Sequence, residues 1–293
     1  MANSAPATPA PVSLDALLPG DMAAKAEAAG VKKATGDALQ LFALAVLAGA
    51  FIGLGAVYCT IVLSGAGSMP YGVQRLLGGL VFCLGLILVI VGGAELFTGN
   101  NLIVMAWANK KVTTLQLLRN WGIVYLGNFV GSVATALIVF FSAQYKFANG
   151  AVGLTAMNIA NSKSSLDFIP AVALGIMCNA MVCMAVWLCF SARTTTDKIL
   201  SILFPISGFV AAGFEHSVAN MYFIPVGLFI KAFDPNVYQL KAFVDAGKTA
   251  ADYAALTWGN LFIKNLIPVT IGNIIGGALM VGGIYWFIYL RKK

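Results

Sequence analysis

Charged residues are scarce in this chain. Asp, Glu, Lys and Arg make up 10% of its 293 residues, against roughly 25% in soluble domains, and hydrophobic residues make up 60%. This shortage of charge excludes an ordinary soluble domain and favours a polytopic membrane protein.

Histidine and cysteine are too few, or too poorly spaced, for most metal and redox chemistry. The chain has one histidine, His216, which excludes bis-histidine haem ligation and a histidine-rich metal cluster. Its five cysteines all lie in apolar stretches, their number is odd and no C-x-x-C occurs, so we interpret them as small buried hydrophobic residues. An enzyme would need a nucleophile–base pair or a ligand cluster. We therefore expect neither a cofactor nor an enzymatic activity.

Long apolar stretches are what the chain does contain. A helix needs about 20 apolar residues to cross the hydrocarbon of a bilayer. The sequence therefore predicts an all-α membrane protein with six transmembrane helices. Their expected positions are near residues 38–64, 76–106, 115–143, 168–192, 199–230 and 257–290.

The basic residues predict an orientation. Eleven of the 18 lysines and arginines fall on the face that carries the N-terminus in this six-helix scheme, and seven fall on the other face. Because positive charge collects on the cytoplasmic side, we expect both termini in the cytoplasm and the chain in the inner cell membrane. The net charge of +7 then reflects membrane topology. No basic run is interleaved with aromatic residues, so nucleic acid is not an expected partner.

One short pattern occurs twice inside the apolar stretches. Residues 93–100 and 213–220 both read G-x-E-x-x-x-x-N, which puts Glu95 and Glu215 at membrane depth. A carboxylate there is energetically costly, so each marks a candidate functional site. The adjacent glycines predict a helix break at each position, with the freed backbone groups facing protein or water instead of lipid.

The repetition extends to the third and sixth predicted helices. The pattern N-x-x-x-V-x-x-G-N-x-x-G occurs at 120–131 and again at 265–276, and a weaker match pairs Gly49 with Gly175. Residues 37–143 and 168–290 are therefore expected to be two repeated halves of three helices. Since three is odd, the second half would enter the membrane from the opposite side, giving an inverted 3+3 repeat with two broken helices facing one site.

These motifs resemble the formate/nitrite transporter family, and its formate channels in particular. The resemblance rests on residues 94–100 (A-E-L-F-T-G-N), 208–220 (G-F-V-A-A-G-F-E-H-S-V-A-N) and 265–277, and it covers the chain from about residue 20 onward. It implies an aquaporin-like fold and a homopentamer with one pore per protomer. It also implies passage of small monovalent anions, most of all formate, together with protons. The aquaporins themselves are disfavoured because no N-P-A pair stands at the breaks.

The resemblance also gives individual residues expected roles. The residues expected to meet the substrate in the pore are His216 at its centre, Thr98 hydrogen-bonded to His216 across the break, the constriction residues Leu86, Leu96 and Phe209, the pore residue Phe97, and Asn273 near the inner part of the pore. The residues expected to give electrostatic support are Glu215 behind the histidine, Lys163 and Asn179 beside that carboxylate, and Glu95 at its own break.

The role expected of His216 follows from the free energy of moving an anion through an apolar constriction. Desolvation of a charge costs several kcal/mol even after relaxation, whereas protonating a formate-like carboxylate at pH 7 costs about 4 kcal/mol. His216 is the only side chain here whose ordinary pKa suits a proton donor at that point. Proton-coupled transport and anion channelling both stay open, as do nitrite or hydrosulfide as the anion. A neutral-solute channel is the alternative from another class, although it would not need Glu, His and Lys at the breaks.

Residues 1–36 are expected to form a separate cytoplasmic segment before the channel domain at 37–293. Residues 1–11 are rich in Ala and Pro and lack the basic region of a signal peptide. Residues 14–39 have a weakly amphipathic, helix-favouring pattern that Pro19 is expected to interrupt. Two interpretations stay open: an interfacial or floppy tail, or a segment that plugs the pore mouth or binds a cytosolic partner.

Overall fold

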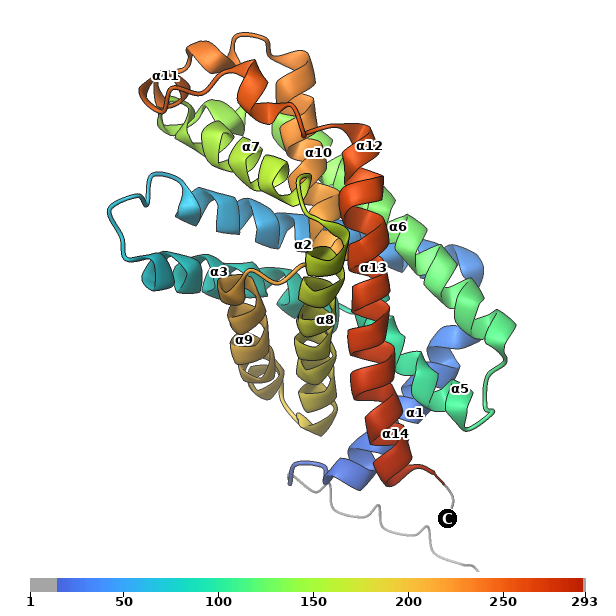
Figure 1. Ribbon diagram of the computed structural model, residues 1–293. Coiled ribbons are helices and arrows are strands. Elements are labelled where there is room, and N and C mark those ends of the chain that lie inside the picture. Colours follow the sequence, from blue (N-terminus) through green and yellow to red (C-terminus); the bar gives the residue numbers. More distant parts are fainter. Residues whose placement is uncertain (1–14, 292–293) are drawn as a thin grey trace, which may run out of the picture.

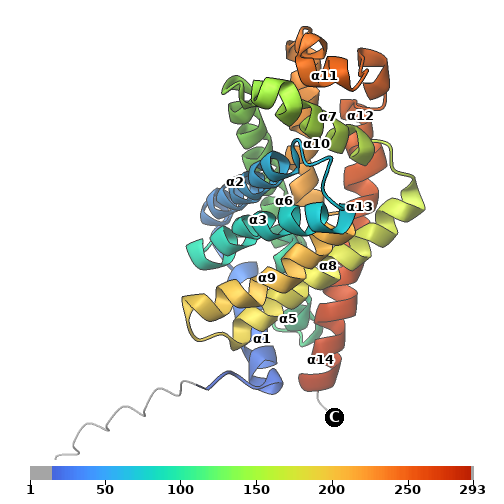
Figure 2. The ribbon, with the colours of Figure 1, turned by 90° about the vertical axis from the view of Figure 1, so that its left-hand side faces the viewer.

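The computed structural model describes residues 15–291, which form helices joined by short loops, and no strand occurs in this range. Residues 1–11, expected to begin a floppy tail, lie outside the described residues. Figures 1 and 2 show a long bundle in which the C-terminal helices run along most of its length. The helices nearest the two ends of the described chain, α1 (Pro19–Ala34) and α14 (Ile284–Tyr289), lie at the same end of this bundle (Figures 1 and 2).

Six helical segments of the described chain are long and apolar enough to cross a membrane, as predicted. They are α2 (Ala38–Leu63), α3 (Tyr71–Gly92), α6 (Thr114–Phe141), α8 (Phe168–Ser191), α9 (Thr195–Ala212) and the C-terminal segment Ala250–Tyr289. The C-terminal segment consists of η5 (Ala250–Tyr253), α12 (Trp258–Asn260), the π-helical η6 (Leu261–Leu266), α13 (Ile267–Ile274), the π-helical η7 (Ile275–Gly283) and α14 (Ile284–Tyr289).

The other described helices are shorter and connect or continue these six. They are α1 (Pro19–Ala34), α4 (Phe97–Asn100), η1 (Asn101–Ile103), α5 (Val104–Ala108), η2 (Gln144–Lys146), η3 (Ala148–Gly150), α7 (Ala151–Lys163), α10 (Ser217–Phe233), η4 (Val237–Gln239) and α11 (Lys241–Asp245).

Both predicted helix breaks are present. Gly93 caps the C-terminus of α3 and Gly213 caps that of α9, where φ is +83° and +77° respectively. Glycine adopts this left-handed conformation without steric cost, which is why helices so often end on it. The chain then resumes as α4 after the first break and as α10 after the second. The paired glycines therefore mark the breaks correctly.

The predicted limits of two helices differ from the observed ones for local reasons. α3 begins at Tyr71, five residues before the expected start, which follows the charged Arg75. Arg75 lies inside the helix and donates to the carbonyl of Ala211 in α9. Pro19 does not interrupt a helix but begins α1, because the first turn of a helix has no use for the backbone N–H that proline lacks.

Helices α1 and α7 lie at opposite ends of the bundle (Figures 1 and 2). α1 is packed against the membrane helices: Met22, Ala23 and Ala26 are buried in one cluster with Met105 and Trp187. The described part of the N-terminal segment is therefore a helix docked on the bundle. The boundary predicted at residue 36 stays a prediction.

Glycines let two helix pairs approach closely. A Cβ on Gly131 would lie 2.0 Å from the carbonyl oxygen of Val46, and a Cβ on Gly276 would lie 2.1 Å from that of Ile176. These contacts join α6 to α2 and η7 to α8. The glycines of the N-x-x-x-V-x-x-G-N-x-x-G pattern are thus needed for packing.

The match of Gly49 with Gly175 is wrong by four residues. Asn128 Nδ2 donates to the carbonyl of Ala45, and Asn273 Nδ2 donates to that of Gly175. Because Asn128 and Asn273 occupy the same position of the repeated pattern, Ala45 is the counterpart of Gly175. Glycine is shared by chance at the two matched positions.

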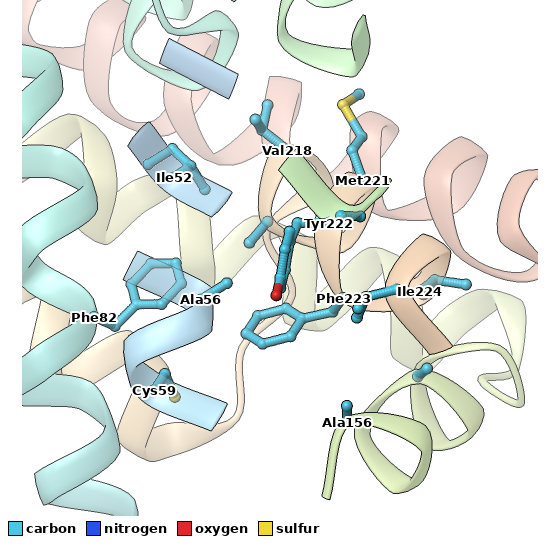
Figure 3. Close-up of a cluster of buried hydrophobic side chains, with 14 of the residues drawn as sticks. Ile52, Ala56, Cys59, Phe82, Ala156, Val218, Met221, Tyr222, Phe223 and Ile224 are labelled. Atoms are coloured by element: carbon cyan, nitrogen blue, oxygen red, sulfur yellow. The ribbon is translucent and has the colours of Figure 1, made fainter. Parts of the chain in front are cut away.

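The half-helix α10 lies in the interior of the bundle. Every residue from Ser217 to Ile230 is buried, as expected for a helix that is apolar on all sides. Figure 3 shows Tyr222 and Phe223 of α10 beside Phe82 of α3, and the rings of Phe82 and Phe223 stack with centroids 6.4 Å apart. This core fixes the position of the second break, which directly precedes α10.

Candidate functional site

Two cavities lie on either side of the breaks. The α1-side cavity has a volume of about 270 Å³, and its lining includes Gly30, Lys33, Leu86, Glu95, Leu96, Asn100 and Phe190. The α7-side cavity has a volume of about 440 Å³, and its lining includes Cys59, Arg75, Phe82, Lys163, Phe209, Glu215, His216 and Phe223. Each cavity is thus lined by one carboxylate of the repeated motif and one lysine.

Apolar side chains border both cavities. Leu86 and Leu96 face the α1-side cavity, Phe209 faces the α7-side cavity, and all three are almost fully buried. The ring of Phe209 stacks on the imidazole of His216, with centroids 5.9 Å apart, and meets the ring of Phe82 edge-on at 5.8 Å. The three expected constriction residues therefore lie at the cavity walls.

His216 and Thr98 join the two breaks. The Nε2 atom of His216 lies 3.0 Å from Oγ1 of Thr98, and both side chains are buried. The backbone N–H of Ala219 donates to Nδ1 of His216 at 3.0 Å, so Nδ1 is an acceptor and the proton of the neutral ring sits on Nε2. The imidazole is thus held at the N-terminus of α10 with its N–H directed toward Thr98.

A lysine and two amides bind the Glu215 carboxylate. Lys163 Nζ lies 2.7 Å from Oε1, while Asn220 Nδ2 and Asn265 Nδ2 donate to Oε2 at 2.6 and 3.2 Å. Asn220 also donates to Oδ1 of Asn265, and Asn265 donates to the carbonyl of Lys163. The buried carboxylate is therefore both ion-paired and hydrogen-bonded, as a charge at this depth requires.

Glu95 has a matching set of partners at the other break. Lys33 Nζ lies 2.7 Å from Oε2, and Asn100 Nδ2 donates to the same oxygen at 2.8 Å. Asn100 also donates to Oδ1 of Asn120, and Asn120 donates to the carbonyl of Lys33. The two breaks are thus built by the same pattern of hydrogen bonds, with α1 supplying the lysine at one and α7 at the other.

Two asparagines support the breaks from behind. Asn128 accepts from the N–H of Phe97 and donates to the carbonyl of Glu95, and Asn273 accepts from the N–H of Ser217 and donates to the carbonyl of Glu215. Freed backbone groups thereby find partners inside the protein. Asn273, expected near the pore, is fully buried as one of these supports.

Two predicted site residues lie elsewhere than expected. The ring of Phe97 packs edge-on against Tyr125 and Trp121 of α6, with centroids 5.0 and 6.0 Å away, and it is outside the lining of both cavities. Asn179 donates to the carbonyls of Thr98 and Asn273 and to Oδ1 of Asn101, so it contacts the first break instead of Glu215.

The sequence interpretation missed Lys33 and four amides. Asn100 and Asn220 end the repeated G-x-E-x-x-x-x-N motif, and Asn120 and Asn265 begin the other repeated pattern, yet none was given a role. Lys33 also had a signal: it stands four residues before the N-cap Asp37 of α2, just as Lys163 stands four residues before Asp167, which precedes α8.

The described residues offer no place for a metal cluster. Nowhere between residues 15 and 291 do three His, Cys, Asp or Glu side chains come close enough together to hold a metal ion. The chemistry of this site therefore rests on hydrogen bonds, two ion pairs and one imidazole.

Comparison with known proteins gives a consistent assignment. The profile of the formate/nitrite transporter family matches residues 20–287. The formate channels FocA of Escherichia coli K12 and of Haemophilus influenzae are 47% and 43% identical, and the alignments cover 95% and 91% of this chain and 96% and 93% of theirs.

Two solved structures share the fold. A pentameric formate channel with formate bound superposes with a TM-score of 0.80 at 46% identity, covering 87% of this chain and 98% of that one. An ion channel described as belonging to the FNT family superposes with a TM-score of 0.77 at 26% identity, covering 92% and 98%. This chain therefore belongs to the formate/nitrite transporter family.

Proposed function

We propose that this protein is a transmembrane channel for formate and other small monovalent anions. The observations that carry the proposal are two cavities, each with a lysine and apolar side chains in its lining, and the buried His216–Thr98 pair that joins the two breaks, with His216 in the lining of the α7-side cavity. The similarity to proteins named as formate channels favours formate among such anions. A channel is a non-enzymatic function, and it needs no cofactor.

In this proposal the lysines collect the anion and the constriction excludes its charge. Lys33 and Lys163 each present an ammonium group in the lining of a cavity, where it can donate a hydrogen bond to an anion while it is paired with its glutamate. Leu86, Leu96 and Phe209 then form a barrier that an anion crosses far less readily than a neutral acid does. The anion must therefore exchange a proton, or be stabilised by hydrogen bonds, between the two cavities.

His216 is the group proposed to supply that proton. Its ring stacks on the constriction residue Phe209, and its Nε2 lies 3.0 Å from Thr98 Oγ1, which can pass a proton on or accept the hydrogen bond. Because Nδ1 accepts from Ala219, the ring can become an imidazolium only by giving up that bond. In this proposal the ring first takes a proton at Nδ1 from the water in a cavity, and the resulting imidazolium then gives its Nε2 proton to formate and returns to a neutral ring. Proton transfer to formate therefore couples to a small movement at the start of α10.

The proposed assembly and topology extend this account. A homopentamer with one pore per protomer is favoured by the similarity to a pentameric channel. The matching hydrogen bonds around Glu95 and Glu215 support the inverted 3+3 repeat and its aquaporin-like arrangement. The excess of lysine and arginine supports cytoplasmic termini in the inner membrane, with the α1-side cavity facing the cytoplasm and the α7-side cavity facing outward.

The role proposed for residues 1–36 changes with the position of α1. A helix that supplies Lys33 to the Glu95 pair belongs to the pore support, so a cytosolic partner would have to bind around α1 without displacing it. We retain such a partner as a proposal for the segment before α1.

Three anions and one neutral solute distinguish the proposed function from its alternatives. Proteoliposomes containing the purified protein should take up formate faster than empty liposomes, with uptake rising as the external pH falls. Nitrite or hydrosulfide moving faster than formate at every pH would favour those substrates. Glycerol moving as fast as formate would contradict an anion channel and favour the neutral-solute alternative.

A further inference from the structure

The two cavities differ in one charged residue that has no counterpart in the repeat. Arg75, in the first turns of α3, lines the α7-side cavity together with Lys163 and Glu215. Glu95 and Glu215 are equivalent positions 120 residues apart, so the position equivalent to Arg75 is Thr195, which is uncharged. The guanidinium is therefore an addition to one side of an otherwise repeated site.

Arg75 leaves its cavity with an unmatched positive charge. In the α1-side cavity Lys33 is paired with Glu95, and in the α7-side cavity Lys163 is paired with Glu215. Within residues 15–291, Arg75 forms no ion pair with a carboxylate. The α7-side cavity thus has a net charge of one more than the α1-side cavity, which attracts anions to it more strongly.

One edge of the guanidinium is used to hold the end of α9. Nε donates to the carbonyl of Ala211 at 3.2 Å, and Nη2 donates to the carbonyl of Val210. These carbonyls belong to the last turn of a half-helix, whose C-terminal end carries partial negative charge and would repel an anion. Arg75 therefore also neutralises an unfavourable part of the cavity wall.

The other edge of the guanidinium is free for a ligand. Of its five N–H groups, the described structure uses two on the carbonyls of α9. A Cβ on Gly213 would lie 3.3 Å from Nη2, so a larger residue at the break would crowd the guanidinium. The remaining N–H groups on Nη1 and Nη2 can together bind the two oxygens of a small carboxylate.

We propose that Arg75 is an anion-binding and specificity-determining residue of the α7-side cavity. It binds a small carboxylate through two N–H groups before the anion reaches Lys163 and His216. This geometry suits formate, and also nitrite, because both have two oxygens on one atom. It gives no such advantage to hydrosulfide, which has a single sulfur. The inference rests on the proposed anion-channel function.

The test measures formate uptake from each face separately, using right-side-out and inside-out membrane vesicles. In Arg75→Gln the formate concentration for half-maximal uptake from the α7 face should rise about five- to tenfold, which corresponds to losing one charge-assisted contact in a hydrated cavity. Uptake from the α1 face should keep its half-maximal concentration. Raising the salt concentration should reduce the difference between wild type and variant.

Two further variants separate ligand binding from structural support. Arg75→Lys keeps the charge without the paired N–H groups, so it should weaken uptake of formate and nitrite but not of hydrosulfide. Lys241→Gln removes a positive charge from an exposed ion pair in α11, outside both cavities, and should change neither face. If Arg75→Gln does not fold, Arg75→Lys with the three anions carries the test.

The outcomes distinguish this inference from the proposed function. A wild-type protein that moves none of the three anions overturns both. If the wild type transports formate normally, the Arg75 inference alone is overturned by either of two results. In one, Arg75→Gln leaves the half-maximal formate concentration at the α7 face unchanged. In the other, it raises that concentration equally at both faces. Equal weakening of all three anions by Arg75→Lys overturns the part concerning specificity.

Discussion

Replacing Lys163 with methionine should destabilise the folded protein by about 3 kcal/mol. The general range for breaking a buried ion pair by removing one partner is about 3–5 kcal/mol. We place this pair at the lower end because the Lys163 side chain is 17% exposed and the Glu215 side chain is 6% exposed, so some water already reaches the site. Glu215 would also keep the hydrogen bonds from Asn220 and Asn265.

The repeat supplies a matched comparison for this prediction. The Lys33 and Glu95 side chains are 33% and 13% exposed, about twice as much as their counterparts. Water can therefore solvate Glu95 more readily once the ammonium is gone, and Lys33→Met should cost about 1–2 kcal/mol, between the values for surface and buried pairs. The two pairs share most of their hydrogen bonds, but Lys33 also donates to Asn100, and Asn265 also donates to Glu215. Exposure is the larger difference between them.

The assay is reversible unfolding in mixed micelles, followed by tryptophan fluorescence. A double-mutant cycle with Lys163→Met and Glu215→Gln should give a coupling energy of about 2 kcal/mol, because the double variant no longer buries an unpaired charge. Equal destabilisation by Lys33→Met and Lys163→Met would refute the argument from exposure. Additive single effects would show that the ion pair itself contributes nothing.

Two further predictions concern packing and pH. Gly131→Ala should destabilise the fold by about 3 kcal/mol or more, because its Cβ would lie 2.0 Å from a backbone oxygen; Gly122→Ala, where nothing lies within 4 Å, should be neutral or slightly stabilising in the same unfolding assay. Burial alone would raise the pKa of Asp234, but hydrogen bonds from Tyr145 and Lys146 hold that pKa below its ordinary value. Ionised Asp234 therefore contributes stability at neutral pH that is lost as pH falls below about 4 and through the lowered pKa. Asp234→Asn should accordingly be less stable than wild type at pH 7, by about 1–2 kcal/mol, and the difference should disappear in acid; a constant difference at every pH would contradict this assignment.

The features that could be predicted from the sequence depend on its composition and its repeated motifs. Apolar length identified the six membrane helices, and the paired motifs around Glu95 and Glu215 identified the breaks. These signals are local, since each depends on a continuous stretch of chain. These signals located the helix breaks but did not predict which residues surround them.

The features missed depend on contacts between distant segments. Asn179 binds the carbonyl of Thr98, 81 residues away, and the spacing of residues along α8 does not determine which neighbour it meets. Phe97 follows a break, so its direction depends on how α4 leaves the break and not on helical periodicity. The predicted helix began after Arg75 because of its charge, although the Arg75 guanidinium is bound inside the bundle by carbonyls at the end of α9.

The central claim is that anions pass between the two cavities by exchanging a proton at His216. Its most direct test is the pH dependence of formate uptake by His216→Phe in proteoliposomes, alongside wild type and with the oligomer checked by size-exclusion chromatography. The phenylalanine ring keeps the stacking on Phe209 but has neither a proton to give nor the acceptor for Ala219. We expect an intact oligomer whose formate uptake no longer rises as pH falls. An intact variant with the wild-type pH dependence would contradict the claim.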